Sequence, residues 1–145
     1  NAGVAQRELA AVHVGVIADR PGQLLRQALQ QRLELAGSGA AAQRYDLAVG
    51  FAISGEGIAV LRDTTATRVR AIGHADWALI AQDPGRTRLA SGSARAVDGF
   101  NIIDVQYFAA DLENEAVQRR LAEALAEQIT IQLAAYFRRH AAASG

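Results

Sequence analysis

The chain has 145 residues, enough for one domain with a single hydrophobic core, and half of them are apolar, which excludes a disordered chain. Its fifteen acidic and fifteen basic residues cancel, so it lacks the basic excess with which nucleic-acid-binding proteins displace counterions. The absence of cysteine excludes disulfides, thiolate metal sites and a cysteine nucleophile.

Every basic residue is an arginine, and no run of apolar residues is long enough for a membrane-spanning helix. Two interpretations of the arginines remain open. A GC-rich genome is one explanation, and bidentate recognition of phosphate or carboxylate is the other. Composition alone does not choose between them.

The first predicted elements are a strand and a helix. Residues 11–18, "AVHVGVIA", alternate so that Val12, Val14 and Val16 share one face of a strand. Pro21 then fits the first turn of a helix, where its missing N–H costs nothing. The apolar stripe of this helix is formed by Leu25, Leu29 and Leu33, and its predicted stop by Gly37 and Gly39.

Three further strands are predicted. Residues 45–53 alternate apolar with small or polar residues, and after "SGEG" at 54–57, a bulge or a bend, residues 58–61 continue the same strand. Residues 67–82 form a long strand, which a Pro-Gly turn at 82–86 joins to a strand at 87–98. The last strand has very small residues on one face: Ala90, Gly92, Ala94 and Ala96.

A long helix is predicted from Asp111, a suitable cap, to Arg139. The element order is therefore β-α-β-β-β-α, which predicts one α+β domain over residues 1–145 with flexible ends at 1–8 and 140–145. We expect a mostly antiparallel four-stranded sheet with two helices on one face. The β-α start predicts that the first strand pairs parallel to a neighbour.

No motif predicts catalysis. The three histidines have no metal-ligand spacing, no serine sits in G-x-S-x-G, and "GEGIAV" lacks the third glycine of a nucleotide-binding loop. Acidic pairs near Asp111 fit helix capping better than acid–base chemistry. We therefore predict no enzyme, no metal and no cofactor.

Two segments carry candidate contacts. "LRDTTATR" at 61–68 joins two predicted strands, and is either a solvated loop with a local Arg–Asp pair or a contact for an anion or a partner. "FNIIDVQYFA" at 100–109 is apolar for a connector, and either covers the core or forms a docking surface.

The sequence resembles the LptE family, in the form found in alphaproteobacteria. The resemblance covers about residues 9 to 139 and is carried by "AVHVGVIADRPGQLLRQALQQRL", "RYDLAVGFAISGEGIAVLRDTTATR" and "SGSARAVDGFNIIDVQYFA" before the long helix. It implies a non-enzymatic outer-membrane lipoprotein on the periplasmic face that plugs the β-barrel partner LptD and assists lipopolysaccharide transport. It also implies a lipidated N-terminal cysteine, which this sequence lacks and which we expect to have preceded residue 1.

The resemblance places basic residues at one end of the sheet in contact with lipopolysaccharide. Arg62 matches the family's arginine after the second strand. The residues that we predict to contact lipopolysaccharide or the partner are Arg62, Asp63, Thr64, Thr65, Arg68 and Arg70. A second basic position of some relatives is replaced here by acidic Asp111-Leu112-Glu113, which weakens the case for a two-arginine clamp.

Two alternatives remain. An auxiliary lipoprotein of an ABC-type lipid transport system has the same element order and a similar "V-x-V…RP" start, but another partner. An enzyme or small-ligand binder would need a deep apolar pocket with convergent polar groups.

Overall fold

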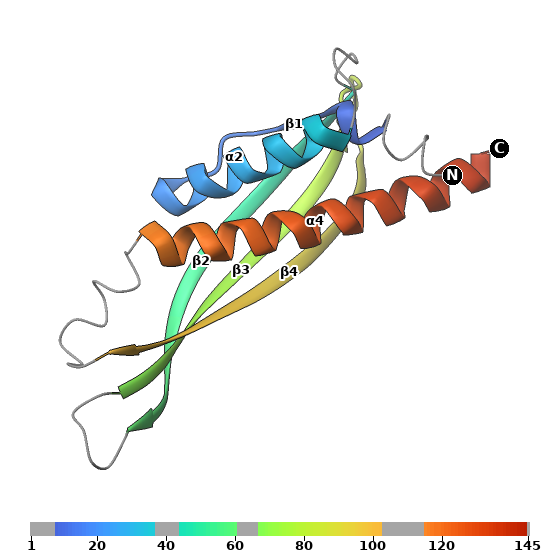
Figure 1. The fold of residues 1–145 in the computed structure, drawn as a ribbon. Coiled ribbons are helices and arrows are strands. Elements are labelled where there is room, and N and C mark those ends of the chain that lie inside the picture. The colour runs from blue at the N-terminus through green and yellow to red at the C-terminus, as the bar shows by residue number, and fades with distance from the viewer. Residues whose placement is uncertain (1–7, 37–43, 61–66, 103–114, 145) are drawn as a thin grey trace.

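The structure is a computed structural model that describes residues 8–36, 44–60, 67–102 and 115–144. The predicted order β-α-β-β-β-α is confirmed (Figure 1). The elements are β1 (Val12–Val14), α2 (Asp19–Ala36), β2 (Tyr45–Val60), β3 (Thr67–Ala81), β4 (Arg88–Ile102) and α4 (Glu115–Ser144).

The four strands form one sheet in the order β1-β2-β3-β4. β1 and β2 are parallel, because α2 carries the chain back between them, and the other pairs are antiparallel. Both helices lie on one face of the sheet and pack against each other (Figure 1). The predicted fold class is confirmed.

β2, β3 and β4 form a long meander. The register shifts in β2 between Gly57 and Ala59, which confirms an irregularity within a continuous strand. The predicted Pro-Gly turn joins β3 to β4 and is closed by the Arg86 N–H, which donates to the Asp83 carbonyl at 3.1 Å. Arg86 has a φ of 49°, a left-handed conformation that suits tight turns.

The first strand is shorter than predicted. β1 ends at Val14, and Val16 is 87% exposed although the alternation places it with two buried valines. Ile17 is buried in its place. After Gly15 donates to the Leu47 carbonyl at 3.1 Å, the segment leaves the sheet to enter α2, so the two-residue period no longer decides which side chain is covered.

A close approach fixes the start of α2. A Cβ on Gly22 would lie 2.7 Å from both the Ile17 side chain and the Ile17 carbonyl. The Pro-Gly pair in the first turn therefore allows the connection to fold tightly against the helix. Arg26 also ties α2 to β1, because its Nε donates to the Val14 carbonyl at 3.3 Å.

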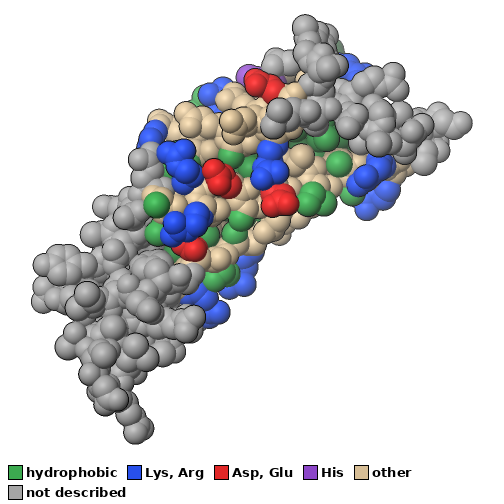
Figure 2. Space-filling view, in the orientation of Figure 1, with side chains coloured by type: hydrophobic (Ala, Val, Ile, Leu, Met, Phe, Trp, Pro, Cys, Tyr) green, Lys and Arg blue, Asp and Glu red, His purple; other side chains and the backbone are tan. Residues whose placement is uncertain are grey.

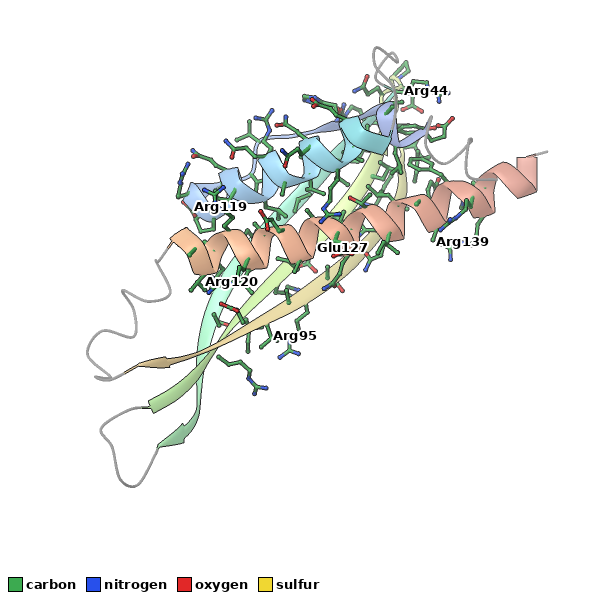
Figure 3. The ribbon with its side chains drawn as sticks, in the orientation of Figure 1. Arg44, Arg95, Arg119, Arg120, Glu127 and Arg139 are labelled. Carbon is green, nitrogen blue, oxygen red and sulfur yellow. The ribbon has the colours of Figure 1, made fainter. Side chains whose placement is uncertain are left out.

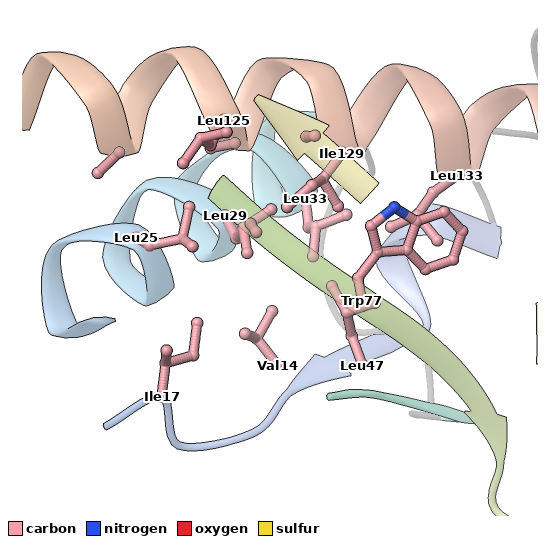
Figure 4. Packing of buried hydrophobic residues seen from close by; sticks show 14 of the residues in the cluster. Val14, Ile17, Leu25, Leu29, Leu33, Leu47, Trp77, Leu125, Ile129 and Leu133 are labelled. Atoms are coloured by element: carbon pink, nitrogen blue, oxygen red, sulfur yellow. The ribbon is translucent and has the colours of Figure 1, made fainter. Parts of the chain in front are cut away.

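The core lies between the sheet and the two helices (Figure 4). The predicted stripe of α2 is confirmed, since Leu25, Leu29 and Leu33 are all buried. The main contributors from α4 are Leu121, Leu125, Ile129 and Leu133. Small residues of the sheet make room for them: Ala71, Ala75, Ala94 and Ala96 are buried beneath the helices.

The last helix is longer than predicted at its C-terminal end. α4 runs to Ser144, five residues past the predicted end at Arg139. The predicted cap at Asp111 and the connector residues 103–110 lie outside the described residues. Neither of the described helices has a stretch both long and apolar enough to cross a bilayer.

Candidate interaction surface

The predicted contact loop joins two paired strand ends. Val60 of β2 pairs with Thr67 of β3, so residues 61–66 connect neighbours at the end of the sheet opposite the β3–β4 turn. The candidates at this connection, Arg62, Asp63, Thr64 and Thr65, lie outside the described residues. Their role stays a prediction.

The two other candidate arginines belong to β3. Arg70 is half-buried and is opposite Glu56 of β2 in the sheet register. Its neighbour Ala71 is buried beneath the helices, so Arg70 occupies a position on the opposite face. Arg68 is two positions earlier in β3, where its side chain is outside the described part. The strand therefore brings one described arginine to the face without helices.

That second face of the sheet, the open face, is built mainly from small and polar residues. The strand period and the register bring ten of them together: Ala48, Gly50, Ala52 and Ser54 of β2, His74, Asp76 and Ala78 of β3, and Ser91, Ser93 and Arg95 of β4. All but Ala78 are exposed. No described helix covers them.

The open face is hollowed near the β3–β4 turn. A shallow depression of about 690 Å³ lies over β2, β3 and β4, and its lining includes Gly50, Asp76, Arg88 and Ser93. A Cβ on Gly50 would have nothing within 4 Å. The surface is broad and open, which suits contact with another macromolecule better than enclosure of a small substrate.

Charges on the open face are mixed in sign. His74 Nε2 lies 3.2 Å from Asp76 Oδ1, and Arg95 is directly opposite His74 in the register. These groups are exposed, so each contributes little to stability. They give this part of the open face a polar surface with an arginine, an imidazole and a carboxylate close together.

At the end of the sheet that carries the β3–β4 turn, the Asp46 carboxylate accepts hydrogen bonds from two side chains. Arg86 Nη1 donates to it at 2.7 Å and Gln82 Nε2 at 2.9 Å. The hydrogen bond from Arg86, followed by that from Gln82, lowers the pKa of Asp46 below its usual value. This network holds the turn against the start of β2.

A second network ties the N-terminal turn to the sheet. Arg44 Nη2 lies 2.5 Å from Glu8 Oε1, and the Tyr45 hydroxyl donates to the same carboxylate. Burial, together with that hydrogen bond, raises the pKa of Tyr45 to about 12. The Tyr45 ring is 5.2 Å from the ring of Phe137, which connects this network to α4.

Arginine and acidic side chains are interspersed over the helical side of the molecule (Figure 2). Near the start of α4, Arg120 donates to Asp98 of β4 at 2.8 Å. Figure 3 shows Arg119 and Arg120 near the start of α4 and Arg139 near its end. The helical layer therefore carries no large region of a single sign in this view.

Sequence reasoning missed the contacts made by glutamines. Trp77 Nε1 donates to Gln132 of α4 at 2.6 Å, and Gln128 bonds the backbone of Arg95. Both glutamines read as ordinary polar helix residues. Their spacing of four was the available signal, because it places them on one side of α4.

Together these features define a class of protein: a small α+β domain whose described helices cover one face of a sheet and leave the other face without a helix. The part of the chain that the structure describes has no group of three or more His, Asp or Glu side chains able to hold a metal ion.

Comparison with known families assigns the chain more closely. Residues 9–133 match the LptE family of lipopolysaccharide-assembly proteins. This protein therefore belongs to the LptE family, as the sequence resemblance predicted. No match was found among curated proteins.

Solved structures share the fold. A candidate lipoprotein from Caulobacter crescentus CB15 aligns with a TM-score of 0.66 at 19% identity, over 95% of this chain and 98% of its own. A minor lipoprotein from Acinetobacter baumannii aligns with a TM-score of 0.54 at 16% identity, over 86% and 88% of the two chains. At these identities the comparison establishes the architecture.

Proposed function

We propose that this protein is a non-enzymatic component of the outer membrane that plugs the β-barrel LptD and assists lipopolysaccharide transport. In this proposal an N-terminal lipid anchors it at the periplasmic face. The observation that carries the proposal is the family match over residues 9–133, which spans nearly every described element.

The open face supports this role. A plug must present a polar surface to the polar interior of a barrel while keeping its own core closed. Here Ala48, Gly50 and Ala52 have at most a methyl side chain, so little projects from the backbone of β2 on the open face. The hydrophobic core lies on the other face of the sheet. A barrel wall could therefore approach the sheet backbone closely.

Copurification tests the partner. The full-length lipidated protein is isolated from outer membranes, and its neighbours are identified by mass. We expect a large β-barrel at equal stoichiometry. An inner-membrane transporter in its place would overturn the barrel partner and support an auxiliary role in an ABC-type lipid transport system.

We further propose that Arg62, with Asp63, Thr64, Thr65, Arg68 and Arg70, contacts lipopolysaccharide or the partner at the loop end of the sheet. The support is positional: β2 and β3 are paired up to Val60 and Thr67, and Arg70 belongs to the same end of β3. A guanidinium forms two parallel hydrogen bonds with a phosphate, which suits the phosphates of lipid A.

Charge reversal tests Arg62. Arg62→Asp should weaken binding of purified lipopolysaccharide about tenfold or more, because a charge-assisted hydrogen bond contributes about 1.5–3 kcal/mol. Arg139→Asp is the matched control, since Arg139 is exposed near the end of α4. Equal binding by the two variants, with both folded by circular dichroism, would remove Arg62 from the contact.

A further inference from the structure

The β4 edge of the sheet is partly closed by side chains of α4. The Gln128 amide accepts from the Arg95 N–H at 3.3 Å and donates to the Arg95 carbonyl at 2.8 Å. Gln132 donates to the Ser93 carbonyl at 3.0 Å. Side-chain amides thus occupy backbone groups that a neighbouring strand would otherwise use.

Among the described strands, none pairs with the outer edge of β2 beyond Leu47. β1 pairs only with Tyr45–Leu47, and β2 runs on well beyond it as the outermost strand (Figure 1). Because Tyr45 and Leu47 turn their peptide groups toward β1, alternation turns those of Val49, Phe51 and Ile53 the same way. Within the described residues, no backbone partner meets these three groups on that side.

The open part of this edge has no protective chemistry. Residues 48–55, "AVGFAISG", contain no charge and no proline, which are the usual means of blocking an edge strand. Val49, Phe51 and Ile53 are half-buried at the margin of the core. An added strand would cover these side chains as well as satisfy the peptide groups beside them.

We propose that the β2 edge between Ala48 and Gly55 is a strand-addition site for an extended, uncharged segment of the partner protein. Apolar side chains at alternate positions of that segment would continue the row of Val49, Phe51 and Ile53. The identification of the partner rests on the proposed function, whereas the edge itself rests on the backbone geometry. Main-chain hydrogen bonds would provide affinity and the apolar row specificity.

Two observations favour a partner segment over a second copy of this chain. Pairing two eight-residue edges alone would bury far less than the roughly 1,200 Å² of a stable specific interface. In addition, β2 leads directly to residues 61–66, the proposed contact loop. A partner that binds this loop therefore contacts the segment that directly follows β2 in the chain.

Hydrogen exchange tests the site. The full-length protein is compared alone and in the assembly isolated from native membranes, with exchange followed in peptides that cover residues 48–55. In the isolated chain the amides of Val49, Phe51, Ile53 and Gly55 should exchange rapidly, while alternate amides are protected by β3. In the assembly we expect the fast amides to slow about tenfold or more.

A backbone variant makes the test specific. Ile53→Pro removes an N–H that faces the open edge, and edge strands tolerate proline at such positions. Ile53→Ala is the matched control, because it shortens the same side chain and keeps the N–H. We expect the proline variant to retain less than about half as much partner as the alanine variant, with circular dichroism confirming that both fold.

The outcomes separate this inference from the proposed function. A barrel partner with unprotected β2 amides overturns strand addition and leaves the function standing. Protected amides in a transporter assembly overturn the barrel and support the edge. Protection in the isolated chain that increases with its concentration assigns the edge to a second copy and overturns the partner segment. If the Ile53→Pro and Ile53→Ala variants retain equal amounts of the partner, strand addition at the β2 edge is also overturned.

Discussion

The two faces of the sheet follow the same two-residue alternation and serve opposite purposes. On one face, Leu47, Leu79 and Trp77 lie beneath the helices with at most 5% of their surface exposed. On the other, Ala52 of β2, Asp76 of β3 and Ser93 of β4 are exposed. The difference teaches that the folding stability depends mainly on the residues of one face. The residues of the other face can therefore be substituted to suit a partner with little loss of stability.

The largest expected effect comes from comparing two positions of β3 that lie on opposite faces of the sheet. Leu79→Ala should reduce the free energy of unfolding by about 2–5 kcal/mol, because it leaves a cavity in the core. Asp76→Ala, on the open face, should change it by no more than about 0.5 kcal/mol. Urea unfolding measures both, and equal losses would contradict the division between the faces.

A glycine pair sharpens the comparison. A Cβ on Gly92 would lie 2.8 Å from the Trp77 ring, whereas one on Gly50 meets open space. Gly92→Ala should therefore destabilise the protein by about 1–3 kcal/mol. Gly50→Ala should be neutral or slightly stabilising.

Fluorescence provides an independent readout, since Trp77 is the one tryptophan in the chain. We expect its emission to shift in Gly92→Ala and to stay unchanged in Gly50→Ala. An unchanged spectrum in both variants would contradict the close packing of the Trp77 ring on Gly92.

The glutamine contacts predict a smaller effect. Gln128→Ala should lower the free energy of unfolding by about 1 kcal/mol. The N–H and the carbonyl of Arg95 then lose their hydrogen bonds to the Gln128 side chain and bond to water instead. The substitution should also increase self-association through β4, measured by sedimentation at rising concentration. Gln31→Ala, an exposed position on α2, is the control.

The smallest expected effect is on the pH dependence of stability below neutral pH. Since Arg86 and Gln82 lower the pKa of Asp46 in the folded state, its contribution is present above the unfolded pKa and is lost as pH falls through the lower folded value. Arg86 is exposed, so we expect less than about 1 kcal/mol. Unfolding measured between about pH 2 and pH 6 should show a shallower loss in Asp46→Asn and in Arg86→Gln.

Alternation and turn chemistry were sufficient to predict the meander. The row from Tyr45 to Ile53, the Pro-Gly turn and the small-residue face of β4 each confirm a local rule. Local rules failed at Val16, where the tight entry into α2, not the strand period, decides which side chain is buried. They also gave no reason to end α4 as late as Ser144.

The site was harder to predict than the fold. The strand period divides the residues of each strand between two faces. Which of these faces both helices cover, and so which residues form the open face, is known only from the structure. The closure of β4 by Gln128 depends on how α4 crosses the sheet, which no local pattern specifies. The role of Arg62 was inferred from family resemblance and remains a prediction.

The parallel pairing of β1 has a consequence for the order of folding. Val12 pairs with Tyr45, so this contact closes a loop that contains all of α2, whereas β2, β3 and β4 pair with their neighbours in sequence. Contacts between distant residues form more slowly, because loop closure must be completed first. We therefore expect the meander to form early and the N-terminal strand to dock late. Because Phe137 of α4 packs on Tyr45, the β2 residue that pairs with Val12, we expect the docking of β1 to be complete only after the last helix has formed.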